Sequence, residues 1–211
     1  MDGSRPVSPP EYFARIRDEA VRRWDQLQAD PGLAGPWQQL FKQVQDPRHV
    51  LSELLQNADD AGASRALVKI EGDTLVLEHD GKDFVEEHFR SICNFGFSNK
   101  RSLSTIGFRG IGWKSTFSLG DQVELMTPSL SVEFRRERFT RPEWVARPLG
   151  KQNLNVMVRV RVREESLRDV LAASFEPTRL SQVRNQARKC ASRGSRASRE
   201  CPQSCVQTSV H

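Results

Sequence analysis

The chain has 211 residues and a formal net charge of +5 at pH 7, with 32 Lys and Arg against 27 Asp and Glu. This length suits one ordinary domain, or one domain with a tail. The sequence has no apolar run of about 18 residues and no apolar stretch after residues 1–6, which argues against a spanning helix and a secretory signal and favours a cytoplasmic protein.

The positive charge is concentrated at the C-terminus. Residues 181–211 hold six basic residues and one acid, so the first 180 residues carry 26 side chains of each sign. A basic segment rich in Ser, Arg and Cys can contact phosphates, but this composition is more typical of disorder. We therefore expect a disordered tail over 181–211, and nucleic-acid binding only through that tail.

Apolar residues at three- and four-residue steps predict helices at the start of the chain. One helix is expected over 8–29, a second over 37–45, and a third from Pro47 to a C-cap at Gly62. The first two form an N-terminal helical extension over 1–46, to which we assign no chemistry.

Strands dominate the sequence that follows. Alternating apolar residues predict strands over 66–70, 74–78, 123–126, 131–134 and 154–162, with helices over 84–94 and 164–175. The first two strands flank Glu71-Gly72-Asp73, which is a hairpin signal. A charged loop is expected over 135–152, and the sequence from residue 181 shows no periodicity.

A polar stripe marks the third predicted helix. Glu53, Asn57 and Asp60 fall within about 60° of one another around the helix axis, opposite an apolar face that contains Leu51 and Leu54. Asn disfavours a helix interior, and no Lys or Arg lies nearby on the helix to pair with the acids. The stripe is therefore either a functional row of oxygen ligands or an ordinary solvated face.

A glycine-rich segment begins after residue 105. Gly107, Gly110 and Gly112 have the spacing G-x-x-G-x-G and precede a short run compatible with a helix. Glycines there allow a ligand to approach the backbone and present N–H groups to an anion. A flexible loop is the alternative interpretation.

Three motifs together resemble the GHKL superfamily of ATPases, and within it the sacsin and NO VEIN group of chaperone-like ATPase domains. They are Glu-Leu-Leu-Gln-Asn-Ala-Asp-Asp-Ala-Gly-Ala from Glu53, His-Asp-Gly-Lys-Asp-Phe from His79, and Ile-Gly-Phe-Arg-Gly-Ile-Gly-Trp-Lys-Ser from Ile106. The resemblance covers about residues 47–175. It implies a Bergerat ATP-binding fold over 47–180, an α/β (α+β two-layer) sandwich with helices on one face of a mixed, mostly antiparallel sheet.

The resemblance also implies roles for the polar stripe and the second motif. Asn57 would coordinate Mg²⁺ on the nucleotide phosphates, and Glu53 would orient and deprotonate the attacking water. Asp60 would shape the pocket near the adenine. Asp80, followed by Gly81, would accept the adenine amino group.

The third motif would contact the phosphates of ATP. Gly107, Gly110 and Gly112 would wrap them, and Lys100 and Lys114 would neutralise their charge. The expected function is ATP binding with slow Mg²⁺-dependent hydrolysis, coupled to closure of the segment 96–114 and serving protein clients or partner domains. The alternative for Lys100 and Lys114 is that they are ordinary surface lysines. The alternative for residues 98–99 is that they only form a turn.

Some features favour a catalytically degenerate nucleotide-binding or protein-interaction module instead. Lys82-Asp83-Phe84 lacks a second glycine that family members usually carry, and the strand over 154–162 lacks the threonine that commonly supports the adenine site. The polar sequence after about Leu180 suggests a truncated or frame-shifted gene product, or a partial domain.

Overall fold

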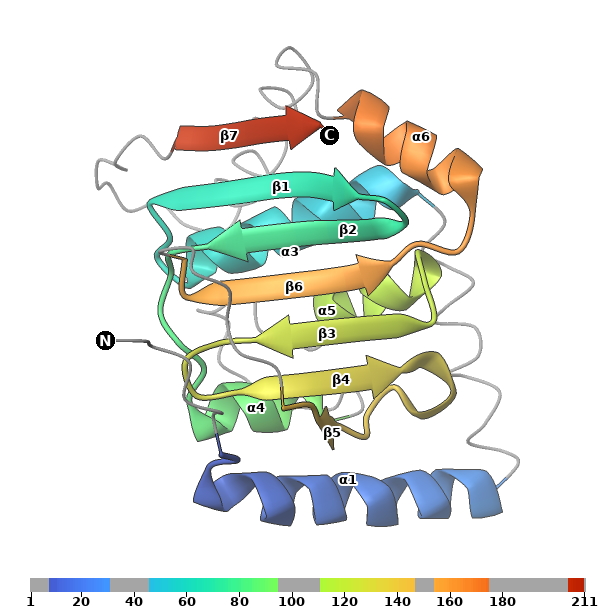
Figure 1. The fold of residues 1–211 in the computed structure, drawn as a ribbon. Helices are drawn as coiled ribbons and strands as arrows, with labels where there is room; N and C mark the ends of the chain where they lie inside the picture. Colours follow the sequence, from blue (N-terminus) through green and yellow to red (C-terminus); the bar gives the residue numbers. More distant parts are fainter. Residues whose placement is uncertain (1–7, 31–45, 95–110, 147–153, 175–204, 211) are drawn as a thin grey trace, which may run out of the picture.

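The computed structural model describes residues 8–30, 46–94, 111–146, 154–174 and 205–210 (Figure 1). Its centre is a seven-stranded sheet with the order β5-β4-β3-β6-β2-β1-β7. The strands are β1 (Arg65–Glu71), β2 (Thr74–His79), β3 (Gln122–Met126), β4 (Ser131–Arg135), β5 (Glu143–Trp144), β6 (Val156–Arg161) and β7 (Cys205–Val210). All neighbouring strands are antiparallel except β1 and β7, which are parallel.

Helices cover one face of this sheet. Figure 1 shows α3 (Pro47–Asp60), α4 (Glu86–Ile92) and α5 (Ile111–Ser115) behind the strands, and α1 (Glu11–Ala29) along the β5 edge. The last helix, α6 (Glu165–Ser174), contacts α3. Two short 3-10 helices complete the described elements, η1 (Thr116–Ser118) and η2 (Arg136–Arg138). The expected α+β sandwich with a mostly antiparallel sheet is confirmed.

The core forms where alternating apolar strand residues meet the helix layer. Leu77 on β2 lies opposite Val68 on β1 and Val158 on β6, and Leu125 on β3 lies opposite Val158 in turn. All four side chains are buried in one apolar cluster. Because side chains alternate across a strand, this register places a continuous apolar row against the helices.

Local sequence signals set the ends of α3. Asp46 is the N-cap, and its carboxylate accepts a hydrogen bond from the backbone N–H of Arg48 at 2.9 Å, with Pro47 in the first turn. Gly62 ends the helix at a φ of 73°, a conformation that favours glycine. The predicted helix from Pro47 is confirmed, with Ala61 as its C-cap and Gly62 as the residue directly after the cap.

Several predicted boundaries were wrong. The first helix begins at Glu11 instead of residue 8, and the helix expected over 84–94 spans only Glu86–Ile92. The charged loop expected over 135–152 contains η2 and β5, which are too short to show periodicity. β7 was not predicted either, because its partner β1 is far away in the sequence. The helix expected over 37–45 lies outside the described residues.

Candidate functional site

The polar stripe of α3 lies opposite the core, as its spacing predicts. Leu51 and Leu54 are buried, whereas the side chains of Glu53 and Asn57 are half-buried and Asp60 is exposed. The apolar face fixes the rotation of the helix about its axis, because turning it would expose the leucines. A carboxylate and an amide are thereby held one helical turn apart, within reach of solvent.

The stripe is electrostatically acidic. Desolvation, followed by the nearby carboxylates of Asp59 and Glu53, raises the pKa of Asp60 above its ordinary value. The imidazole Nε2 of His49 lies 3.8 Å from the Glu53 carboxylate, one turn earlier on the helix. Carboxylates gathered on one helix favour a bound cation, which is the chemistry expected of a Mg²⁺–phosphate site.

Asp80, directly after β2, holds the loop between α3 and β1. Its Oδ1 accepts hydrogen bonds from the backbone N–H groups of Ser64 at 2.8 Å and Arg65 at 2.9 Å, and its Oδ2 accepts one from the Ser64 hydroxyl. These bonds, the hydroxyl first, lower the pKa of Asp80. A carboxylate has about four acceptor positions, so one on Oδ2 is left for a donor such as an amino group.

Gly81 joins the second motif to the end of α3. A Cβ placed on Gly81 would lie 2.8 Å from His79 Nδ1 and 2.9 Å from Ala61 Cβ, so only glycine fits this approach. The backbone N–H of Lys82 donates to the carbonyl oxygen of Ala61 at 3.0 Å. Ala61 is one turn beyond Asn57, so the Asp80–Gly81 turn is held at the C-terminal end of the polar stripe.

His79 and Asn155 support this turn. The backbone N–H of Gly81 donates to His79 Nδ1 at 3.2 Å, and desolvation lowers the pKa of that buried imidazole to about 4. The side-chain amide of Asn155 donates to the carbonyl oxygens of Asp80 and Gly81 at 3.3 Å and 3.2 Å. The histidine is therefore neutral at pH 7, and its Nδ1 acts as an acceptor.

The glycine-rich motif is only partly described. Lys100, Gly107 and Gly110 lie outside the described residues, whereas Gly112 lies in α5, which contacts α3. The structure therefore brings Gly112 to the helix layer of the candidate site. The predicted phosphate-binding roles of Lys100 and the three glycines all stay predictions.

Lys114 on α5 is buried, with 2% of its surface exposed. Its ammonium donates to the backbone carbonyl of Asn94 and lies 5.9 Å from the centre of the Phe139 ring. Desolvation lowers the pKa of Lys114 to about 8. In this arrangement its amino group points into the helix layer, so contact with a phosphate would require the side chain to move.

Sequence reasoning missed two residues of the second motif's surroundings. Ser64 and Asn155 hold the Asp80–Gly81 turn, yet neither was singled out, and Asn155 fell inside the strand expected over 154–162. The only available signal was position, since each lies within two residues of the start of a strand.

A magnesium ion bound with nucleotide would find few protein ligands here. Among the described residues, no group of three or more His, Cys, Asp or Glu side chains could hold a metal ion by itself. Mg²⁺ commonly takes one or two protein oxygens together with water and substrate phosphates. Asn57 and Glu53 supply oxygens of that kind on one face of α3.

The fold and site define an α+β protein with an acidic helical stripe beside an Asp–Gly turn. No protein-family model matches the chain. A stretch of 103 residues, 46% of this chain, is 33% identical to Protein NO VEIN from Arabidopsis thaliana. The chain spans about 4% of the length of that protein. Within the described segments, no helix has the length and apolar character needed to cross a membrane.

Proposed function

We propose that this chain contains an ATP-binding domain of the GHKL class that hydrolyses ATP slowly with Mg²⁺. The supporting observation is the junction of two motifs, in which the Lys82 N–H bonds to Ala61 and seats the Asp80–Gly81 turn at the end of α3. This junction holds Asp80 in a turn at the C-terminal end of the helix that carries Glu53 and Asn57. The partial similarity to Protein NO VEIN agrees with this class.

Each residue of the site has a stated task in this proposal. Asn57 binds Mg²⁺, which neutralises phosphate charge when bound, and Glu53 positions a water and takes its proton. Asp80 accepts the adenine amino group at the unused position of Oδ2. Gly81 lets the turn approach His79 and Ala61 closely, and Asp60 shapes the pocket near the adenine.

We propose further that the phosphates meet the glycine motif. Gly107, Gly110 and Gly112 offer backbone N–H groups, with Lys100 as the nearby cation. In this proposal the domain acts in the cytoplasm as a chaperone does. Its nucleotide state controls its contacts with protein clients or partner domains.

A protein-interaction module without catalysis is the second candidate. Three of the four acceptor positions of Asp80 are already used within the protein, and the amino group of Lys114 is buried. Both observations fit a fold that has kept its motifs for structural reasons.

Thermal melting of the full chain with and without Mg²⁺-ATP separates the two candidates. A ligand bound only to the folded state at about 100 times its Kd stabilises the protein by about 2.7 kcal/mol. We expect an upward shift in Tm that requires Mg²⁺ and is lost in Asn57→Ala. Asp59→Asn, a change at an exposed position about 100° or more around the helix from each stripe residue, should keep the shift. A folded protein with no shift supports the interaction module.

A further inference from the structure

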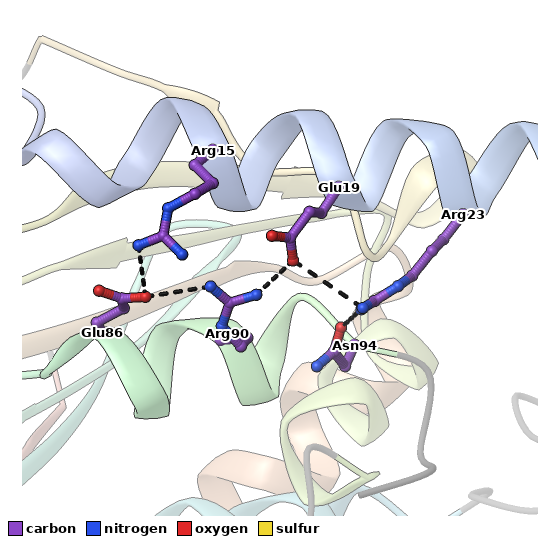
Figure 2. Close-up of polar contacts among 6 residues, drawn as sticks. All are labelled: Arg15, Glu19, Arg23, Glu86, Arg90 and Asn94. Atoms are coloured by element: carbon purple, nitrogen blue, oxygen red, sulfur yellow. Dashed lines mark hydrogen bonds and ion pairs between the residues drawn. The ribbon is translucent and has the colours of Figure 1, made fainter.

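A regular polar ladder connects α1 to α4. Three pairs of residues join α1 to α4 and to Asn94, which lies two residues beyond the end of α4. They are Arg15 with Glu86, Glu19 with Arg90, and Arg23 with Asn94, and each pair is 71 residues apart in sequence (Figure 2). The constant separation means that the segments run in the same direction. Steps of four residues place each member one turn after the previous one.

The rungs of the ladder share their acceptors. Glu86 Oε1 accepts from Arg15 at 2.7 Å and from Arg90 at 3.1 Å, and Arg90 also donates to Glu19. Arg23 Nη2 lies 4.0 Å from Glu19 Oε2, and its other terminal nitrogen donates to the side-chain oxygen of Asn94. The charges therefore alternate along one connected row, which Figure 2 shows between the two helices.

An apolar contact lies beside the ladder. Phe13 of α1 stacks on Phe89 of α4 with ring centroids 5.7 Å apart, and both side chains are buried. The stacked rings add an apolar contact to the ion pairs, which are partly exposed and contribute little by themselves. The ladder then fixes the relative position of the helices along their length.

The last rung ends on a residue with a second contact. The side chain of Asn94 accepts from Arg23, while its backbone carbonyl accepts from the ammonium of Lys114 on α5. A displacement of Asn94 therefore moves an acceptor of a buried cation. Because a buried ammonium is strongly disfavoured without acceptors, the position of that carbonyl restricts where Lys114 can lie.

We propose that Arg23 and Asn94 are positioning residues, through which α1 fixes the side chain of Lys114 and with it the helix of the glycine motif. α5 contacts α3, which carries Glu53 and Asn57. The N-terminal helix α1 is thus one of the elements that position the residues of the candidate site. The link to nucleotide, but not the ladder itself, rests on the proposed function.

Lysine labelling of the full chain tests the positioning directly. Reductive methylation followed by mass spectrometry reports how accessible each amino group is, with exposed Lys82 as the internal reference. In Arg23→Met we expect Lys114 to react several-fold faster relative to Lys82 than in the unaltered protein. Arg22→Met is the matched control, because Arg22 is the exposed neighbour on the same helix and is not one of the ladder residues.

A second variant removes the same rung from its other end. Asn94→Ala should raise Lys114 labelling as Arg23→Met does, and the double variant should react no faster than either single one, because both lose one interaction. Labelling of Lys114 that is equal in Arg23→Met, Arg22→Met and the unaltered protein would overturn the proposal.

Ligand affinity supplies a readout that a purely structural role would not move. Arg23→Met should weaken binding of Mg²⁺-ATP several-fold while leaving adenosine binding unchanged, since α5 follows the phosphate-binding glycines and not the adenine site. Equal weakening for both ligands would overturn the positioning role. If the unaltered protein binds no ATP, the proposed function is wrong. The labelling result still tests whether Arg23 and Asn94 position Lys114.

Discussion

The backbone N–H of Lys82 donates to the carbonyl oxygen of Ala61 at 3.0 Å, which joins the turn after β2 to the last turn of α3. The carbonyl groups at the end of a helix lack partners within the helix, so this bond also satisfies one of them. Two motifs that are separated in sequence thus become one structural unit. The first prediction tests that unit.

Gly81→Ala should destabilise the protein by about 1–3 kcal/mol, because the new methyl would overlap His79 and Ala61. Chemical denaturation measures the loss. Ala61→Gly removes one of the two clashes, so it should restore part of the stability of Gly81→Ala. It should not rescue Gly72→Ala, whose cost comes from a φ of 59° without any close atom. Identical responses of the two glycine variants would contradict the close approach.

His79 should make stability depend on pH between about 4 and 6.5. Its pKa is about 4 in the folded protein and 6.5 when exposed, so the unfolded state takes up the proton first as pH falls. The stabilising effect is complete above pH 6.5 and is lost as pH falls to 4, by an amount on the order of 3 kcal/mol. His79→Asn keeps an acceptor near Gly81 and should flatten the curve in this window. Parallel curves for the two proteins would rule out a buried neutral histidine.

Lys114 should have an effect of the same sign at high pH. Its pKa is about 8 in the folded protein against an ordinary value of 10.5, so above pH 8 the unfolded state keeps the proton longer. Relative to Lys114→Met, the unaltered protein should therefore gain stability between pH 8 and 10.5. Denaturation midpoints across this range measure the difference, and a constant difference would place the ammonium in solvent.

Glu53→Gln should slow ATP hydrolysis by about 10²–10⁴-fold while leaving ATP binding intact, because the amide cannot take a proton from water. Phosphate release and equilibrium binding measure the two effects separately. Asp59→Asn removes the same charge from an exposed position on the same helix and should leave the hydrolysis rate unchanged. Hydrolysis that survives Glu53→Gln would remove this residue from its assigned role.

The spacing of apolar residues predicted the helices and strands whose structure is determined by residues close to one another in the sequence. The polar stripe of α3, the hairpin around Gly72 and the alternation of β6 are all local patterns, and the structure contains them. The acids of the stripe fell where helical geometry puts them, because the leucines leave only one way to bury the helix.

Long-range contacts could not be predicted in the same way. The resemblance implied that Lys114 neutralises phosphate charge, and the sequence showed no sign that its side chain is buried beside Phe139, on a different element. Asn94 looked like a helix end, and its partner Arg23 is 71 residues away. Such pairings depend on tertiary packing, which leaves no periodic trace in the sequence.

The packing of α1 determines how the domain can open. Phe13, Ile16, Ala20 and Trp24 lie in the same buried cluster as the residues of β2, β3 and β6. Detaching α1 would therefore expose one side of the hydrophobic core. The amide protons of α1 should then exchange with solvent through the same rare openings as those of the central strands. A boundary drawn at residue 46 would cut through a single cooperative folding unit.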